Sequence, residues 1–168
     1  MRILWLSLLI GCMSEVEVPP DVAHPKRISG KGYTVAYPGN WEVRKREPDY
    51  DKDHHIRLQS PGGCNVLIEI HTPPIKLRPR LQKIATLKTL TLKDPQIVPI
   101  KQWGTNNGHG VILTGQPEPE DPTDFPQYTV FGAEYTHLTY TITEECRGKL
   151  RPIAEPGLKL IANTFDTL

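Results

Sequence analysis

Five residues between positions 49 and 55 could bind a metal ion. They lie in the sequence DYDKDHH and are Asp49, Asp51, Asp53, His54 and His55. Alternating carboxylates are typical of a calcium loop, which also needs glycine at its sixth position and glutamate at its twelfth. Here those positions hold His54 and Ser60, so a calcium loop is excluded. We predict a solvated charged turn, because adjacent histidines on a strand point to opposite faces and do not readily bind one ion.

Nucleophilic catalysis has weaker support in the sequence. There is no G-x-S-x-G motif, which would place a serine nucleophile on a sharp turn. Cys64 could act as a thiol nucleophile with His71 or His109, provided that folding brings them together. The glycines of GTNNGHG match neither a dinucleotide-binding loop nor a P-loop. The sequence therefore predicts no catalytic residue, no metal ligand and no cofactor.

The chain contains three cysteines, Cys12, Cys64 and Cys146. Cys64 begins an apolar, strand-like run and Cys146 ends another, so antiparallel pairing of these strands would bring their sulfur atoms together. In an oxidising compartment the two thiols can form a disulfide. We predict a Cys64–Cys146 bridge, with two separate buried thiols as the alternative. Neither cysteine belongs to a C-x-x-C pair, which argues against a zinc site.

The first twelve residues, MRILWLSLLIGC, have the pattern of an export signal. Arg2 is followed by a mainly apolar run that ends at the small residue Gly11. The run is too short for a membrane span, which needs roughly 20 residues. The segment LIGC, Leu9 to Cys12, resembles the lipobox of bacterial lipoproteins. The resemblance implies that Cys12 becomes the new N-terminus and carries fatty acyl chains such as palmitate. An ordinary signal peptide that contains a cysteine is the alternative.

This resemblance sets the expected domain organisation. We expect a signal peptide at 1–11, a lipidated N-terminus and flexible tether at 12–31, and a single domain at 32–168. Acyl chains would hold the protein at a membrane of the cell envelope. Residue 13 is methionine rather than aspartate. In a host with two membranes, the resemblance therefore implies the outer membrane, facing the periplasm.

The composition fits one folded domain without a nucleic-acid partner. Removing residues 1–11 from the 168-residue chain leaves 157 residues, enough for one domain. The whole chain has 20 Lys and Arg, including Arg2, and 19 Asp and Glu, so the mature chain is formally neutral. A nucleic-acid-binding domain usually has a strong basic excess. The 17 prolines are scattered, which indicates rigid loops in a folded chain.

Hydrophobic patterning predicts an antiparallel sheet with two helices. Alternating apolar residues predict strands at 33–37, 41–43, 55–60, 64–72, 96–103 and 109–116. The Asn- and Gly-rich loop 104–108 predicts a hairpin between two of them. Segments 128–135 and 137–146, rich in Thr, Tyr and β-branched residues, are predicted as a second hairpin or one long bent strand. An apolar stripe with a spacing near 3.6 predicts a helix over 80–92. A second helix is predicted over 155–165, with Pro156 in its first turn. The fold class is α+β, an antiparallel sheet covered by helices.

Two segments of this pattern resemble the PsbP and Mog-type fold. They are YTVAYPGNW (33–41) and LIANTF (160–165), with the strands and helix between them. The resemblance covers 32–168 and implies an α/β/α sandwich. It also implies a non-catalytic accessory or assembly module that docks onto a larger protein. None of the family's partner-contacting or metal-binding residues can be matched to positions here. Trp41 and Trp103 are expected as aromatic residues of the core or its rim rather than as part of a ligand site.

Charged residues form two clusters along the chain. The basic cluster is Lys76, Arg78, Arg80, Lys83, Lys88 and Lys93, and the acidic cluster is Glu118, Glu120, Asp121 and Asp124. The basic cluster could face anionic lipid head groups. We favour the simpler interpretation, in which it is the exposed side of an amphipathic helix.

Two functions are compatible with the sequence. The first is a membrane-anchored cell-envelope lipoprotein that acts as a non-catalytic binding or assembly module for a protein partner. The alternative is an envelope hydrolase or metal-dependent protein whose site combines distant residues: His54, His55, His71 and His109. Convergence of three or more of these histidines and nearby aspartates in a pocket would favour the alternative.

Overall fold

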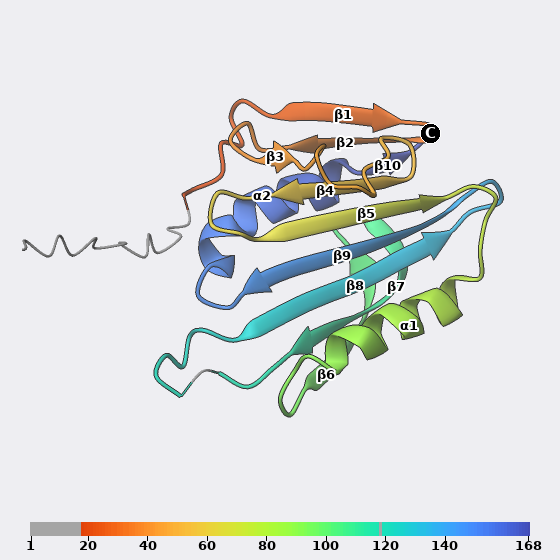
Figure 1. Cartoon of the computed structure of the whole chain (residues 1–168). Helices are drawn as coiled ribbons and strands as arrows, with labels where there is room; N and C mark the ends of the chain where they lie inside the picture. Colours follow the sequence, from red (N-terminus) through yellow and green to blue (C-terminus); the bar gives the residue numbers. More distant parts are fainter. Residues whose placement is uncertain (1–17, 118) are drawn as a thin grey trace, which may run out of the picture.

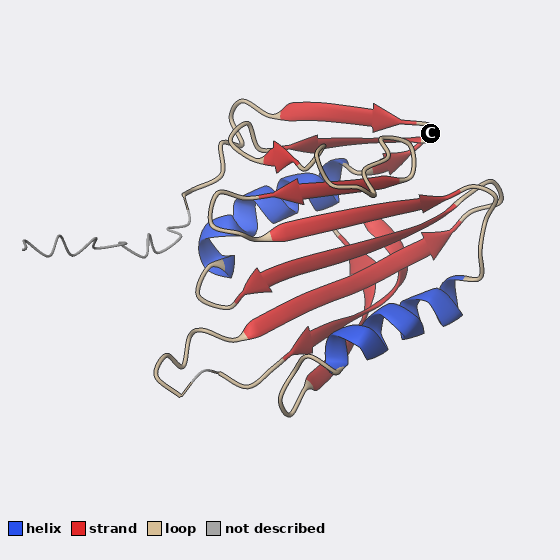
Figure 2. Cartoon of the chain, viewed as in Figure 1, coloured by secondary structure: helices blue, strands red, loops and turns tan. Residues whose placement is uncertain are grey.

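The computed structural model describes residues 18–117 and 119–168. Over these residues the chain forms a seven-stranded sheet, a three-stranded sheet and two helices (Figures 1 and 2). All strand pairs in both sheets are antiparallel. The α+β class predicted from the sequence is confirmed.

The large sheet contains, in spatial order, β3 (Glu42–Val43), β4 (His55–Gln59), β5 (Asn65–His71), β9 (Thr139–Arg147), β8 (Pro126–Glu134), β7 (Asn106–Thr114) and β6 (Gln96–Trp103). The small sheet contains β1 (Lys26–Gly30), β2 (Tyr33–Tyr37) and β10 (Asp166–Thr167). The helices are α1 (Leu77–Thr89) and α2 (Arg151–Thr164). The two helices lie on opposite faces of the large sheet (Figure 1).

The alternation of buried and partly exposed side chains shows which residues lie on each face of the large sheet. Along β5, Val66, Ile68 and Ile70 are buried while the residues between them are partly exposed. On β9, Ile142 lies opposite Ile68 and shares its face. These residues pack with α2 and the small sheet around Trp41, Tyr33 and Phe165 in the main core: Tyr33, Val35, Trp41, Ile56, Leu58, Phe131, Tyr140, Leu158, Ile161 and Phe165 are among its members.

Helix α1 covers part of the other face. Leu113, Tyr128 and Val130 form a second apolar cluster there, against which Leu81 and Ile84 of α1 pack. The first turn of α1 has no acidic residue of its own. Glu134 of β8 takes that role, because its carboxylate accepts a hydrogen bond from the Leu77 amide. The end of β8 therefore fixes where α1 begins.

Some element boundaries differ from those expected. Residues 26–30 were expected in the flexible tether, but they form β1 and pair with β2. Farther upstream, the Pro19 carbonyl accepts a hydrogen bond from Asn40 Nδ2 at 3.0 Å. The ordered part of the domain therefore begins before residue 32. The sequence missed β1 because it has no buried face: its five residues are exposed or partly exposed.

Both helices begin earlier than predicted. Helix α1 spans 77–89 instead of 80–92, and α2 begins at Arg151 instead of Glu155. Pro152, not Pro156, occupies the first turn of α2, where a missing N–H costs nothing. Pro156 lies inside the helix, and burial of Leu158, Ile161 and Ala162 on the following turns compensates for the lost hydrogen bond.

The β6–β7 hairpin is tighter than the predicted five-residue loop. β6 ends at Trp103 and β7 begins at Asn106, so only Gly104 and Thr105 form the turn. Gly104 has a φ of 58°. A positive φ at the first turn position and a normal one at the second fit a type II′ turn, which suits the strand twist. An added Cβ at Gly104 would also lie 2.3 Å from the Ala162 carbonyl oxygen.

Candidate functional site: two grooves beside helix α1

The histidines and aspartates of segment 49–55 pair with each other in the structure. His54 Nδ1 lies 2.9 Å from Asp51 Oδ2, and His55 Nε2 lies 2.8 Å from Asp49 Oδ2. The Asp51 carboxylate also accepts a hydrogen bond from the Asp53 amide at 2.8 Å. The hydrogen bonds from His54 and Asp53 hold the pKa of Asp51 below its usual value. The segment is a charged, internally bonded turn.

The histidines of the metal hypothesis do not converge. His55 and His71 lie on or at the ends of neighbouring strands β4 and β5, but His109 is on β7, and β8 and β9 lie between β7 and β5. Across residues 18–117 and 119–168, no group of three or more His, Cys, Asp or Glu side chains could hold a metal ion. The structure therefore gives the metal-dependent alternative no support from a convergent pocket.

Glu69 is the centre of a polar network beneath α1. Its Oε1 accepts a hydrogen bond from Arg80 Nη2 at 2.6 Å, and its Oε2 accepts one from Thr141 Oγ1 at 2.9 Å. His71, two residues along β5, has its Nε2 buried without a hydrogen-bond partner among the described residues. Burial, with smaller contributions from Arg80 and His54, lowers the pKa of His71 below 6.5 against the opposing effect of Glu69. The network holds the N-terminal half of α1 on β5 and β9.

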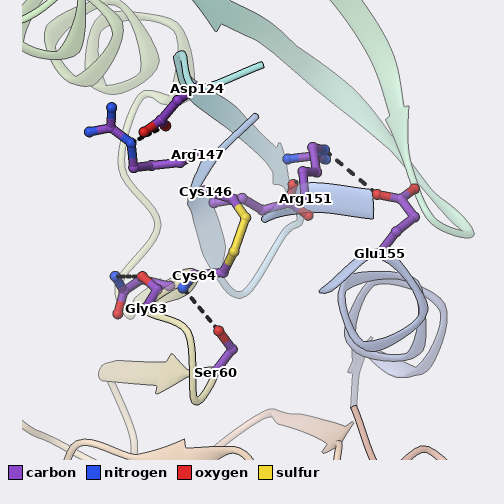
Figure 3. Close-up of a disulfide and its surroundings, with 10 residues drawn as sticks. Ser60, Gly63, Cys64, Asp124, Cys146, Arg147, Arg151 and Glu155 are labelled. Carbon is purple, nitrogen blue, oxygen red and sulfur yellow. Dashed lines mark hydrogen bonds and ion pairs between the residues drawn. A yellow bond between two sulfur atoms is a disulfide. The ribbon is translucent and has the colours of Figure 1, made fainter. Parts of the chain in front are cut away.

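Cys64 and Cys146 are joined by a disulfide (Figure 3). Asn65 pairs with Glu145, so the two cysteines lie directly opposite each other at the same end of β5 and β9, with Cα atoms 4.4 Å apart. Both are buried, and the Cys64 amide donates to Ser60 Oγ at 2.9 Å. The hypothesis of a thiol nucleophile at Cys64 with His71 or His109 is therefore wrong.

The acidic cluster is bound to the end of the same strand. Asp124 is buried and contacts Arg147 of β9 (Figure 3). It also lies 2.6 Å from Lys149 Nζ. Hydrogen bonds from Arg147 and Lys149 lower the pKa of Asp124. Asp121 accepts hydrogen bonds from Thr123, which lower its pKa too. Glu118 lies outside the described residues. Asp124 therefore holds its loop on the end of β9, while Glu120 is exposed.

Two grooves run along the flanks of α1, where it lies on the sheet. The apolar groove, about 500 Å³, lies between α1 and the strands β6 and β7. Its apolar lining residues are Leu81, Ala85, Leu90, Ile97, Val111 and Val130, with Arg78 and His109 at its rim. The charged groove, about 340 Å³, lies between α1 and the strands β4, β5 and β9. It is lined mainly by Arg57, Glu69, Arg80, Lys83, Lys88 and Glu145.

The apolar groove exposes large aliphatic side chains. Leu90, directly after α1, is 78% exposed, and Ile97 of β6 is 55% exposed. Val98 is almost equally exposed at 54%, but it pairs with Ile112 and therefore points to the other face of the sheet. β6 is the outermost strand, with the C-terminal end of α1 beside it (Figure 1). Exposed aliphatic side chains that line one hollow make this groove a candidate interaction site.

The charged groove is satisfied by its own ion pairs. Arg80 pairs with Glu69, and Lys88 Nζ lies 3.1 Å from Glu145 Oε2 and 4.6 Å from the ring centre of Tyr128. Leu87, at 57% exposure, is its one large exposed aliphatic residue within the described part of the chain. Within the basic cluster of the sequence, Arg80 and Lys88 are paired in this groove, whereas Lys83 lines it without an ion pair among the described residues.

A third hollow, about 330 Å³, lies between α2 and the strands β6 to β9. Its floor holds the buried Glu144, which accepts hydrogen bonds from Trp103 Nε1 at 2.7 Å and Arg151 Nη2 at 3.0 Å. Arg151 also lies 3.6 Å from Glu155 (Figure 3). The charges of Glu144 and Arg151 compensate each other. We therefore interpret this hollow as the site of an internal ion pair that joins α2 to the sheet. Trp103 and Trp41 are both buried, as predicted.

The N-terminal predictions fall on residues that the structure does not describe. Cys12, the signal peptide and the first part of the tether lie within residues 1–17. In the part of the chain that is described, no helix has the length and apolar character needed to cross a bilayer. The lipid anchor at Cys12 stays a prediction.

Comparison with known proteins was informative only at the level of structure. No protein-family model matches the sequence. No curated protein matches it either. The Ran-binding protein Mog1p of Saccharomyces cerevisiae superimposes with a TM-score of 0.57 at 8% identity, over 86% of this chain and 95% of Mog1p. The chain has the Mog1 and PsbP fold. Cyanobacterial PsbP from Synechocystis matches with a TM-score of 0.50 at 11% identity, over 95% of this chain and 99% of that protein.

A Bacteroides thetaiotaomicron protein also matches, with a TM-score of 0.51 at 11% identity. The match covers 85% of this chain but 48% of the Bacteroides protein. At these identities the likeness establishes the fold and nothing about the ligand. The predicted resemblance to the PsbP and Mog-type fold is confirmed.

Sequence reasoning did not find the apolar groove. The segment QIVPIKQW was predicted as a strand, but its place at the edge of the sheet was not. Pro99 carried the available signal, since proline is confined to edge strands and irregular positions within sheets. The exposure of Leu90 and Ile97 depends on how far α1 extends over the sheet, which no local pattern encodes.

Proposed function

We propose that this protein is a non-catalytic binding module, held at a cell-envelope membrane by a lipid on Cys12, that docks a partner protein in the apolar groove. The observation that carries the proposal is the exposure of Leu90 and Ile97 on opposite walls of one groove. Covering such side chains with a partner would remove apolar surface from water, which is favourable by about 25 cal/mol for each Å².

The chemistry of the remaining surface supports binding over catalysis. Among the described residues, the histidines of segment 49–55 pair with aspartates and Cys64 is in a disulfide. Mog1p, which shares the fold, is described as a Ran-binding protein. By analogy with Mog1p, we expect this chain to bind a protein partner, which would be unrelated to Ran. The formally neutral mature chain favours protein over nucleic acid.

The entry point of the chain supports the use of the α1 face. Pro19 and Asp21 are bonded to Asn40, and Pro20 lies against Gly157 of α2. The described chain thus enters on the α2 side of the large sheet, while the apolar groove is on the opposite face. Five residues lie between Cys12 and Val18, so six residue-to-residue steps limit the distance between them to roughly 21 Å. A lipid on Cys12 would leave the groove accessible to a partner.

Two experiments test the two parts of this proposal. Fractionation of cells that express Cys12→Ser tests the anchor, and the variant is expected in the soluble fraction. Purification of the tagged protein from detergent-solubilised membranes tests the groove, with Ile97→Asp and Val98→Asp compared. A partner that wild type and Val98→Asp retain, but Ile97→Asp loses, supports docking in the groove. Equal retention by both variants contradicts it.

A further inference from the structure

We infer that the segment of the partner seated in the apolar groove is an acidic amphipathic helix. This inference rests on the proposed function and adds the chemistry of the partner. It follows from three features: an edge strand that resists strand addition, a groove whose length suits a helix, and an unpaired arginine in the groove lining with further basic residues on the same segment of chain.

The edge of β6 is a poor template for an added strand. Pro99 pairs with Val111. Because proline has no N–H, this is a non-hydrogen-bonded pair of the antiparallel ladder. The Pro99 nitrogen therefore faces the free edge, in the middle of the strand. Ile97, two residues earlier, also faces the edge, so the row of free donors is interrupted at Pro99. Lys101 lies at a shift of register between Ile100 and Gln102, which makes the edge irregular there. Proline and lysine on an edge strand are typical protections against strand pairing.

The dimensions of the groove suit a helix lying beside α1. The 13 residues of α1 span about 20 Å, or between three and four turns. A partner helix packed on it would place apolar residues at i, i+3 or i+4, and i+7 against the groove. Leu81 and Ala85 of α1 lie one turn apart along this wall, and Leu90 extends it. Ile97 forms the opposite wall.

The charge around the groove selects an acidic partner. From Ile70 to Lys93 the sequence contains six basic residues and no acidic one. Arg80 and Lys88 pair on the charged-groove side. Arg78, which lines the apolar groove, is exposed and makes no ion pair with any described residue. Lys76 and Lys93, at either end of α1 and outside the groove lining, are also exposed and unpaired among the described residues. Carboxylates on the partner would be attracted to these side chains, which raises the association rate and fixes orientation.

The same charge argues against other occupants. A second copy of this chain would bring two such basic segments together, and like charges facing each other are costly. A membrane surface would meet the α1 face only if the molecule turned its chain entry away from the bilayer. A bilayer surface is also flat, whereas the aliphatic residues here line a hollow.

A peptide titration tests the inference directly. The protein is the full chain with Cys12→Ser, which removes the acylation site. The probe is a fluorescent peptide of about 18 residues, long enough to form a helix on binding, with leucines on one face and glutamates on the other. The matched peptides carry lysine in place of glutamate, or the same residues in scrambled order. Each is titrated by fluorescence anisotropy at low and high salt.

We expect the acidic amphipathic peptide to bind at least about tenfold more tightly than the basic and scrambled peptides. Ile97→Asp should weaken its binding about tenfold, and Val98→Asp should leave it unchanged. Arg78→Glu should weaken it several-fold, whereas Arg46→Glu, an exposed arginine outside the groove, should not. Salt should weaken binding, since exposed charges are screened beyond about 10 Å at 0.1 M.

Three results would overturn the inference. The first is that the protein binds the acidic amphipathic peptide no more tightly than the basic and scrambled peptides, or binds none of them. Another is equal loss in Ile97→Asp and Val98→Asp. The third is that the protein binds vesicles that contain anionic lipid but not neutral vesicles, and that Arg78→Glu abolishes this binding whereas Ile97→Asp leaves it unchanged. The proposed function fails separately, if the retained partner does not depend on Ile97.

Discussion

The two grooves beside α1 share one helix and one face of the sheet, yet they differ in what their walls leave unsatisfied. In the charged groove, β5 and β9 contribute Glu69 and Glu145, which pair with Arg80 and Lys88. In the apolar groove, β6 contributes Ile97, and nothing in the described chain covers it or Leu90. A surface that satisfies its own polar groups positions a helix. A surface that leaves aliphatic side chains in water is suited to binding.

The free energies expected for ion pairs and for buried apolar residues support this difference between the two grooves. Exposed or half-exposed ion pairs contribute about 0–1 kcal/mol each, so the charged groove adds orientation more than stability. Stability of the α1 face comes instead from the apolar cluster beneath the helix, where Leu113 is fully buried. The comparison therefore separates three regions that mutation can address independently.

The largest effect is expected for Leu113→Ala. Leu113 belongs to the buried cluster against which Leu81 and Ile84 of α1 pack, so its truncation leaves a cavity under the helix. We expect the free energy of unfolding to fall by about 2–5 kcal/mol. Urea unfolding measures it, with Leu113→Met as the volume-conserving control. A loss of less than about 1 kcal/mol would mean that α1 is held by its ion pairs instead.

Disruption of the Glu69 network should have a smaller effect. Arg80→Ala removes the 2.6 Å ion pair and leaves Glu69, 13% exposed, with Thr141 as its hydrogen-bond donor. We expect a loss of about 1–2 kcal/mol. A double-mutant cycle with Glu69→Gln isolates the coupling between the two side chains. Additive losses would show that the pair does not position α1.

The sequence predicted the parts of this fold that depend on local alternation. Alternating apolar residues predict which face of β5 and of β9 is buried. The cysteines at the ends of these apolar runs lie in register, which accounts for the Cys64–Cys146 disulfide. It did not predict β1, whose residues pack no core, or the charged network, which joins Arg80 to Glu69 across α1 and β5. The apolar groove was missed for the same reason: its two walls are set by strand order and helix placement.

A pH effect at His71, beside the Glu69 network, should be smaller again. The lowered pKa of His71 means that the unfolded chain takes up a proton more readily than the folded one. His71 therefore contributes stability that is complete above about pH 6.5 and is lost as the pH falls through the folded-state pKa.

His71→Gln should flatten the change in unfolding free energy between about pH 5 and pH 8, measured by urea titration at each pH. This range lies above the usual pKa of 3.8 of Asp51, Asp121 and Asp124, whose pKa values are lowered further, so their contributions stay constant. An identical pH dependence in the variant would show that neighbouring Glu69, Arg80 and His54 compensate for the burial of the imidazole.

The smallest effect on stability is expected at the exposed leucines. Leu90→Ser and Leu87→Ser should each change the unfolding free energy by less than about 0.5 kcal/mol, because both side chains are largely exposed. Thermal unfolding measures this. A loss above about 1 kcal/mol in Leu90→Ser would show that Leu90 serves the fold and not a partner.

The same two leucines give the most direct test of the account. Leu90 lies in the apolar groove and Leu87 in the charged groove, on opposite flanks of α1. A photoreactive amino acid placed at each position in turn, in cells that express the full chain, reports which groove is occupied. We predict a discrete protein adduct at position 90 and none at position 87. An adduct of equal yield at both positions, or at position 87 alone, would contradict the assignment of the apolar groove as the docking surface.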